Sequence, residues 1–342
     1  MNIRIFAITC AAVCTVFLGG CASGNVYRVA LTPEVSAQLK ASGVSGVVAV
    51  RTDEIGTSIS ESNLSASTGA TSGLLGSLVG GIMDSIIDNR ETRRSEAAAA
   101  GIRSGLLEYA FDQALVNAFS QRFAPAGEGA HALSSVVASK NTTVWLISQL
   151  AREASGDAVA MVFARHLLSP DFQNVILDAE AVVCAKSEAL RAIATTRTYA
   201  RQDVPVLYRN KIQLSWSLPE SAKPEGAAKL PKLTRHSPPA KIHRHNNNSR
   251  KAYQAAWAKD GASAMRAALD ALAVELAEVV YWDLGEPARE NYANAPGIDG
   301  PIATRDFRFA NRSDGLPGYL YRREGDRLWL RTRDGCIYVQ SE

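Results

Sequence analysis

Apolar runs and alternating apolar and polar positions along the chain predict a series of β-strands. Val44–Val50 is a short valine-rich run, and Ala158–Leu168 is almost continuously apolar, as expected for a central strand that is covered on both faces. Residues 175–184 and 208–218 alternate, which predicts neighbouring antiparallel strands with one face in the core and one in water. Residues 132–139 are interpreted as a further strand.

Apolar residues spaced four apart predict a helix at residues 74–87. Its apolar side is formed by two adjacent rows, which are Leu74, Leu78, Ile82, Ile86 and Leu75, Val79, Met83, Ile87. On the other side, Gly76 and Gly80 have the spacing that lets helices approach closely. The helix is either a membrane-facing or oligomer-forming element, or one that covers a sheet in a soluble core. We favour the second interpretation, because amphipathic core helices are much commoner than interfacial ones.

Three more helices and a small β-meander follow from the same kind of pattern. A helix is expected from Ile102 to Phe123, with Pro125 ending it, and another over residues 143–154, with Gly156 as its stop. A late helix is predicted at residues 252–284. Strands are predicted at residues 320–322, 328–331 and 336–339, with turns at Gly325 and Gly335.

Two segments lack such patterns. Residues 51–73 are rich in Ser, Thr and Gly and are interpreted as a flexible loop, and residues 219–251 as a disordered or extended basic insertion. The insertion is a solvated spacer or a site for anionic head groups or cell-wall carboxylates, and we favour the spacer. No aromatic residue interrupts residues 221–251, which argues against single-stranded nucleic acid as a partner. The basic residues are Lys223, Lys229, Lys232, Arg235, Lys241, Arg244, Arg250 and Lys251.

Together these elements predict an α+β fold, with a mixed or antiparallel sheet covered by helices and a C-terminal helix with a small β-meander. The expected division places an α+β domain at residues 44–218, the basic linker at 219–251, and the helix and meander that complete the fold at 252–342. A signal peptide at residues 1–20 and a tether at 21–43 precede them.

The N-terminus carries the most specific signal of the chain. Arg4 lies in a short polar head, an apolar run extends from Ile5 to Leu18, and Leu18-Gly19-Gly20-Cys21 follows. The run is shorter than the roughly 20 apolar residues that a spanning helix needs, which is typical of an export signal. The pattern resembles the lipobox of bacterial lipoproteins. That resemblance implies a diacylglyceryl thioether on Cys21, and Ala22 behind it implies the outer membrane of a Gram-negative cell, on its periplasmic side.

Composition and cysteine usage are compatible with an exported globular protein. Hydrophobic residues make up 46% of the 342 residues, and the net charge of +3 is too small to indicate a nucleic-acid partner. Once a signal peptide is removed, Cys184 and Cys336 remain besides Cys21. They either form one disulfide or are two buried thiols. Neither has the neighbouring Cys or His spacing of a metal site.

We find no sequence motif of a known catalytic site, and no cofactor or metal is expected. Asp178 and Glu180 share one strand face, with Glu180 expected opposite Arg209 or Lys211. Paired carboxylates of this kind act as acid and base only when burial separates their pKa values, so we interpret them as a solvated face. His166 is expected to be a hydrogen-bonded core residue. His236, His243 and His245 are interpreted as solvated linker residues rather than metal ligands.

The order of elements from residue 44 to 218 is similar to the small α/β domain of several periplasmic lipoproteins. The residues that carry this are Leu146-Ile147-Ser148-Gln149-Leu150, Gly156-Asp157-Ala158-Val159 to Arg165, and 175–183. Proteins with such a domain include the curli secretion lipoprotein, the lipoproteins that activate penicillin-binding proteins, and the N-terminal part of the Tol–Pal propeller protein.

The sequence therefore predicts a non-enzymatic, lipid-anchored envelope protein that serves as an accessory or assembly factor. Its expected partners are the membrane, through the lipid on Cys21, and an envelope protein. One alternative is a membrane-active homo-oligomer of a secretion system, and a second is a cell-wall or lipid hydrolase that uses Asp178 and Glu180.

Overall fold

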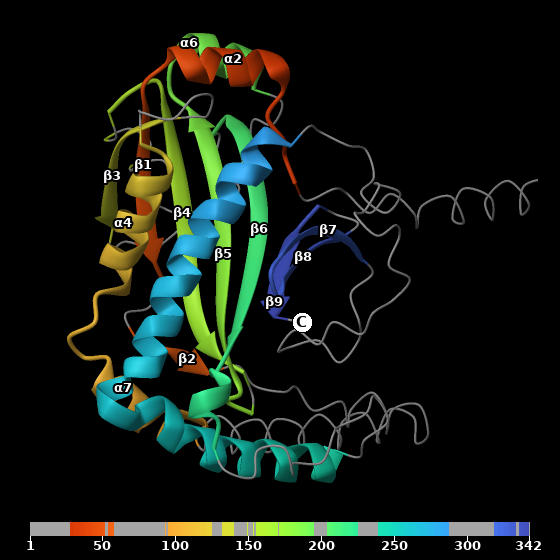
Figure 1. Cartoon of the computed structure of the whole chain (residues 1–342). Coiled ribbons are helices and arrows are strands. Elements are labelled where there is room, and N and C mark those ends of the chain that lie inside the picture. Colours follow the sequence, from red (N-terminus) through yellow and green to blue (C-terminus); the bar gives the residue numbers. More distant parts are fainter. Residues whose placement is uncertain are drawn as a thin grey trace, which may run out of the picture.

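A computed structural model of the chain describes residues 28–51, 54–57, 93, 95–124, 132–139, 149, 153, 155–169, 171–194, 204–224, 239–286, 318–332 and 335–341 (Figure 1). The predicted α+β class is confirmed, since helices cover a mixed sheet of nine strands. The strands are β1 (Val44–Val50), β2 (Gly56–Thr57), β3 (Leu133–Ser139), β4 (Ala158–Leu168), β5 (Asn174–Ala185), β6 (Val206–Ser217), β7 (Gly318–Glu324), β8 (Arg327–Thr332) and β9 (Ile337–Ser341).

The strands lie in the order β3-β1-β4-β5-β6-β9-β8-β7, and β2 pairs with the end of β4. The first three strands of this order are parallel, and the hairpin-like pairs β4–β5 and β5–β6 are antiparallel. The predicted C-terminal meander is present, and its last strand, β9, pairs in parallel with β6. The meander therefore extends the same sheet instead of forming a separate one.

Helix α4 (Phe111–Arg122) and the second half of α7 (Pro239–Gly285) cover one face of the sheet (Figure 1). The main core lies between them and the strands. It contains the inward row of β5 and the predicted apolar stripe of α7, namely Leu269, Leu272, Leu276 and Val280, each at most 5% exposed. Two shorter helices, α2 (Pro33–Ala41) and α6 (Glu188–Ile193), lie at one end of the sheet, and a 3₁₀ turn, Glu220–Ala222, follows β6.

The second face of the sheet carries a smaller apolar cluster, so that β4 is buried on both sides as predicted. The cluster is formed by Val47, Ala49, Val159, Met161, Phe163, Val182, Cys184, Val204 and Val206. The alternation predicted for β5 and β6 is also confirmed, because Leu177 and Leu214 lie in the main core while Asp178 and Gln213 lie on the other face.

The predicted tether at residues 21–43 is wrong for its second half. Val29 forms a β-bridge with Arg209 of β6, and Arg28 is buried. Residues 33–41 form α2, whose start is fixed by Thr32, which accepts a hydrogen bond from the Val35 amide, and by Pro33 at the first helical position. Folded structure therefore already includes residues 28–43, and it reaches much closer to Cys21 than predicted.

The long helix α7 begins earlier than predicted and is kinked. Residues 239–250 are helical, which corrects the assignment of this part of the basic insertion as disordered or extended. Within α7 the backbone leaves helical geometry from Lys259 to Ala262, and Asp260, Gly261 and Ala262 have positive φ angles of 50°, 65° and 61°. A single straight helix over residues 252–284 is therefore wrong, and the two halves run in different directions (Figure 1).

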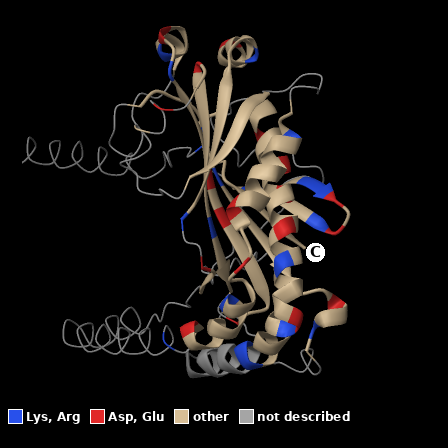
Figure 2. Cartoon of the chain, turned by 90° about the vertical axis from the view of Figure 1, so that its left-hand side faces the viewer, with Lys and Arg blue, Asp and Glu red and all other residues tan. Residues whose placement is uncertain are grey.

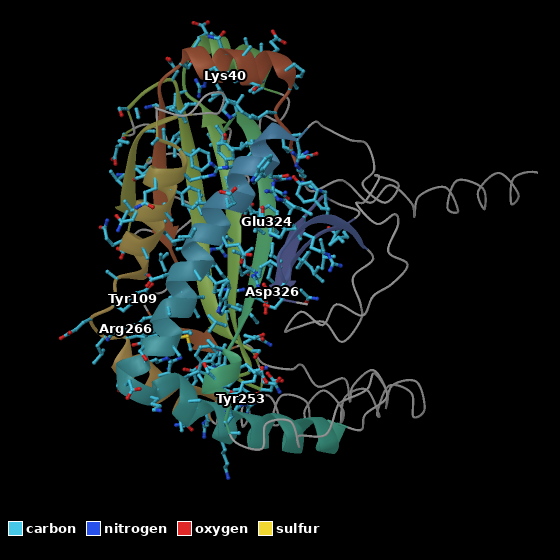
Figure 3. The ribbon with its side chains drawn as sticks, in the orientation of Figure 1. Lys40, Tyr109, Tyr253, Arg266, Glu324 and Asp326 are labelled. Carbon is cyan, nitrogen blue, oxygen red and sulfur yellow. The ribbon has the colours of Figure 1, made fainter. Side chains whose placement is uncertain are left out.

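The predicted helix from Ile102 to Phe123 is in fact two helices. Residues 95–105 are helical, a turn covers 106–110, and α4 then begins at Phe111. The break faces the kink of α7: Gly105 packs so closely on Ala262 that a Cβ atom added to Gly105 would lie 2.7 Å from the Ala262 Cβ. Arg266 donates hydrogen bonds to the carbonyl oxygen of Gly105, and Tyr109 donates one to Asp270 (Figure 3).

The interpretation of residues 51–73 as a loop is corrected at 56–57, which form β2 beside β4. The predicted helix at 74–87 lies outside the described residues, as does the signal peptide. Of the predicted helix at 143–154, residues 149 and 153 are described, and both are helical. Gly156 has the positive φ, 88°, that suits its expected place after a helix.

Candidate functional site

The most concentrated group of buried charges in the described residues surrounds Asp283, in the last turn of α7. The apolar stripe of α7 continues through Leu276 and Val280, and the next position on that face is Asp283. Its carboxylate is therefore directed into the protein, and Asp283 is 0% exposed. A carboxylate in this position requires several donors, since burial without them is very costly.

Three side chains donate hydrogen bonds to the Asp283 carboxylate, and a fourth, that of Arg331, forms an ion pair with it. Arg28 Nε lies 2.9 Å and Arg331 Nη2 lies 2.7 Å from Oδ1. Tyr208 Oη and Asn210 Nδ2 lie 2.6 and 2.8 Å from Oδ2. These four side chains come from the N-terminal segment, β6 and β8, so the carboxylate is held by three separate parts of the chain.

Arg28 and Arg331 also bind backbone carbonyl groups around this carboxylate. Arg28 Nη2 donates to the carbonyl oxygens of Asp283, at 2.6 Å, and Glu286, at 2.8 Å, which satisfies acceptors that the end of α7 leaves without helical partners. Arg331 Nη1 donates to the carbonyl of Gly335 at 3.2 Å, and Asn210 Nδ2 donates to the same oxygen at 3.1 Å. We call Arg28, Tyr208, Asn210, Asp283 and Arg331 the Asp283 cluster.

The charges of the cluster shift the pKa values of its members. Burial by itself raises the pKa of Asp283, but Arg331, Arg28 and the hydrogen bonds from Tyr208 and Asn210 outweigh it and lower the pKa to about 2. Burial is also the main reason that the pKa of Tyr208 is raised well above its usual value, and the charge of Asp283 adds to it. The carboxylate is therefore charged and the phenol neutral at neutral pH.

The chemical role that this arrangement supports is structural. Solvent does not reach the Asp283 carboxylate, and both of its oxygens are occupied by donors from the protein itself. A buried network of hydrogen bonds and ion pairs of this kind fixes the parts of the chain that supply its members. Here it joins the N-terminal segment, the end of α7 and the meander to β6.

Sequence reasoning did not find this cluster. The available signal was Asp283 itself, a charged residue at a position of the apolar stripe of α7. Its partners, residues 28, 208, 210 and 331, are distant in sequence, and no local pattern marks them as neighbours.

Asp178 and Glu180 lie on the second face of the sheet, as predicted, and both are close to arginines. Arg165 Nη2 lies 2.8 Å from Asp178 Oδ2, and Arg51 Nη2 lies 3.9 Å from Glu180 Oε2. Glu180 is paired across the strands with Lys211, one of its two expected neighbours. Figure 2 shows acidic and basic positions side by side along the strands. These contacts describe a surface on which acidic and basic side chains are paired.

Cys184 and Cys336 are both buried and are not joined by a disulfide in the structure, as the interpretation of two buried thiols expects. Cys184 is paired with Val206 at one end of β6, whereas Cys336 precedes Ile337, which is paired with Ile212. This offset along the strand exceeds the roughly 7 Å between Cα atoms that a disulfide tolerates. His166 is buried as expected, 2% exposed, with its ring 5.0 Å from that of Phe111.

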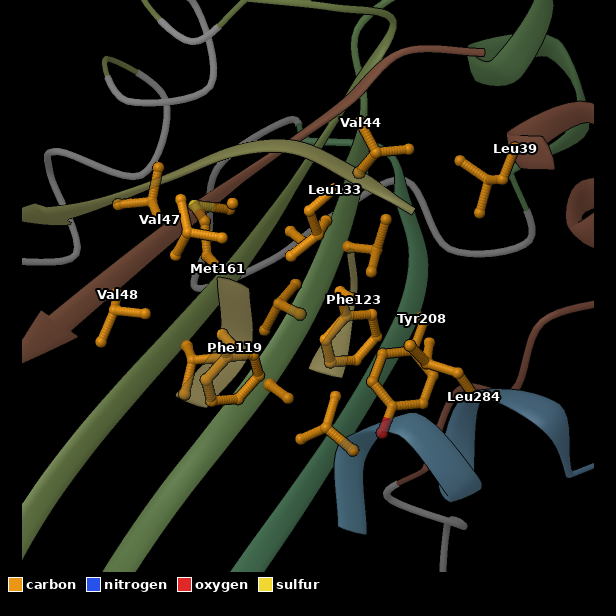
Figure 4. Close-up of a pocket in the computed structure, with 18 residues that line it drawn as sticks. Leu39, Val44, Val47, Val48, Phe119, Phe123, Leu133, Met161, Tyr208 and Leu284 are labelled. Carbon is orange, nitrogen blue, oxygen red and sulfur yellow. The ribbon is translucent and has the colours of Figure 1, made fainter. Parts of the chain in front are cut away.

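A small apolar cavity of about 30 Å³ lies between the sheet, α4 and the end of α7 (Figure 4). Phe119, Phe123, Val280 and Leu284 line it, and the edge of Tyr208 reaches it from the Asp283 cluster. A cavity of this size holds one or two water molecules at most. It marks imperfect packing next to the cluster and does not define a ligand site.

The described residues contain no group of three or more His, Cys, Asp or Glu side chains that is arranged to hold a metal ion. Of the basic linker residues, Arg250 is buried, Lys251 is exposed and Lys223 is bonded to Glu220, while the side chains of the other five and of His236, His243 and His245 lie outside the described part. No described helix is long and apolar enough to cross a membrane.

No protein-family model matches the chain, and neither a curated protein nor a solved structure matches it. The resemblance to periplasmic lipoproteins therefore stays a prediction.

Proposed function

We propose that the protein is a non-enzymatic envelope lipoprotein, held by a lipid on Cys21 at the periplasmic side of the outer membrane, where it acts as an accessory or assembly factor. The observation that carries the proposal is the sequence Leu18-Gly19-Gly20-Cys21 after a short apolar run with a positive head. Two or three acyl chains on one cysteine give stable anchoring, whereas a single chain gives marginal binding.

The Asp283 cluster supports this proposal, because it provides a firm attachment for a tether. Arg28 is the first described residue, and it is locked to the end of α7 and, through the shared carboxylate, to Arg331. Six residues separate Arg28 from Cys21. An anchor on Cys21 therefore holds the folded domain close to the bilayer, where partners embedded in or attached to the envelope are within its reach.

Fractionation of cells tests the proposal. The chain is expected in the membrane fraction, and its Cys21→Ser variant is expected to lose that association while it keeps its fold. Chemical crosslinking in intact cells then tests the accessory role, with an envelope protein crosslinked to the wild-type chain and lost in the released variant. A Cys21→Ser chain that stays in the membrane fraction contradicts the anchor.

The second candidate function is a membrane-active oligomer, and the observation that favours it is the apolar stripe of residues 74–87 with its glycine-containing opposite side. Light scattering of the delipidated protein decides between the two. A homo-oligomer that binds lipid vesicles supports the second candidate, and a monomer that ignores vesicles supports the first.

A further inference from the structure

Next to the attachment of the tether, the outer side of α7 carries an exposed aromatic group. Trp282 is 41% exposed, although tryptophan side chains in folded proteins are highly buried on average. Val274 is 60% exposed and lies on the same side of the helix, two turns earlier. Tyr281, partly buried, adjoins Trp282 with its ring edge to face at 6.1 Å.

Arginines surround these rings. The guanidinium of Arg322, on β7, lies 4.0 Å from the centre of the Trp282 ring, and that of Arg122, on α4, lies 3.4 Å from the centre of the Tyr281 ring. The Trp282 indole donates a hydrogen bond to Glu278 at 2.6 Å, and Glu278 also pairs with Arg122. Basic positions on the hairpin of β7 and β8 are visible beside α7 in Figure 2. We call Arg122, Val274, Tyr281, Trp282 and Arg322 the α7 patch.

The α7 patch combines side chains that prefer the boundary between lipid and water. Tryptophan and tyrosine rings are enriched at the level of lipid head groups, where an apolar body and a polar edge are both satisfied. Arginine guanidinium groups can bind phosphates through their planar set of donors. Here those of Arg122 and Arg322 lie over the rings, and they also pair with Glu278 and Glu324 respectively.

The position of the patch is set by the tether. Asp283 and the carbonyl of Glu286, which Arg28 binds, are within four residues of Trp282 on α7. An extended chain spans at most about 3.6 Å per residue, so the seven steps from Cys21 to Arg28 cover no more than about 25 Å. If Cys21 is acylated, this end of α7 is held within that distance of the membrane surface.

We propose that the α7 patch rests on the head groups of the membrane that holds the lipid anchor, with Trp282 at the boundary with the acyl chains. The inference rests on the proposed lipid anchor. It fixes the orientation of the domain, with the end of α7 toward the bilayer and the kink of α7 away from it.

Quenching of tryptophan fluorescence by brominated lipids tests the orientation. The acylated full chain is reconstituted into vesicles of phosphatidylethanolamine and phosphatidylglycerol that contain lipids brominated near the head group, and flotation confirms that it is bound. The brominated lipid is expected to quench part of the tryptophan fluorescence of the wild-type chain. The quenched fraction is expected to be at least twofold smaller for Trp282→Phe.

A matched control comes from Leu107, which is 84% exposed in the turn after Gly105. Because Gly105 binds Arg266, this turn lies about 24 Å along α7 from Trp282. Leu107→Trp on the Trp282→Phe background is expected to add no quenching. Two results would overturn the proposed orientation: equal quenching of the wild type and Trp282→Phe in floating vesicles, or strong quenching of a tryptophan at position 107. Either result would leave the proposed lipid anchor standing. Failure of the wild-type chain to become acylated overturns the proposed anchor itself.

Discussion

Arg28 and Asp283 are 255 positions apart in the chain, and Arg28 Nε lies 2.9 Å from Asp283 Oδ1 with both side chains fully buried. This ion pair connects the first described residues to the end of the longest helix. It also explains why the domain does not begin at β1, as the sequence suggested, but at the segment that leads directly to Cys21.

Loss of the Asp283 charge is expected to destabilise the protein strongly. In Asp283→Asn two arginines remain buried without their counter-ion, and breaking a buried pair by removing one partner costs about 3–5 kcal/mol. Urea unfolding measures the change. Asp270→Asn serves as the control, because Asp270 is exposed and binds Tyr109 at the surface, so a loss of about 1 kcal/mol or less is expected there. Similar losses in the two variants would contradict a structural role for the cluster.

The lowered pKa of Asp283 predicts a specific loss of stability in acid. The folded pKa of about 2 lies below the ordinary value of 3.8, so the charged carboxylate stabilises the fold above about pH 4. This contribution, about 2 kcal/mol, is lost as the pH falls toward 2. Unfolding free energies measured between pH 5 and 2 are expected to fall more steeply for the wild type than for Asp283→Asn. Parallel curves would show that Asp283 does not titrate with a lowered pKa.

Gly101 and Gly105, four positions apart on one helix, are expected to respond oppositely to alanine. In Gly105→Ala the new Cβ meets the Ala262 Cβ at 2.7 Å and backbone atoms of the kink at 3.0 Å, so a loss of about 1–3 kcal/mol is expected. In Gly101→Ala the nearest atom is 3.9 Å away, and alanine gains up to about 1 kcal/mol of helix propensity. Thermal unfolding of both variants tests whether the packing at the kink is as close as described.

Cys184 and Cys336 are expected to remain thiols even after export. Burial raises the pKa of Cys184 to about 12, which leaves little thiolate for oxidation at neutral pH. Mass spectrometry of peptides prepared without reductant, from protein alkylated in denaturant, is expected to show both cysteines alkylated. A peptide pair joined through these two residues would show that they form a disulfide after all.

The regular patterns of the chain were sufficient to predict most of the sheet. The apolar pattern within a strand indicates which of its faces are buried, and this pattern can be read from neighbouring residues. It was enough for the valine run of β1, the apolar run of β4 and the alternation of β5 and β6. The parallel pairing of β9 with β6 was not predictable, because Ile337 and Ile212 meet only through tertiary packing.

The errors have a common physical origin in contacts between distant segments. The Asp260-Gly261 pair is a local turn signal, but an apolar stripe on the following residues outweighed it, and the positive φ angles of Asp260 and Ala262 occur where the kink packs on Gly105. The polar residues around Pro239 suggested disorder, although they form the start of a helix whose later turns bury Tyr253 and Trp257. The Asp283 cluster was missed for the same reason, since four of its five members lie far from the fifth in sequence.

The central claim is the lipid anchor on Cys21, and the mass of the N-terminal peptide of the protein purified from bacterial membranes tests it most directly. The account predicts that this peptide begins at Cys21 and carries the added mass of a diacylglyceryl group and an amide-linked acyl chain. It also predicts that cells expressing Cys21→Ser incorporate no radioactive palmitate into the chain. An N-terminal peptide that begins elsewhere, or a Cys21 with an unmodified thiol, would contradict it.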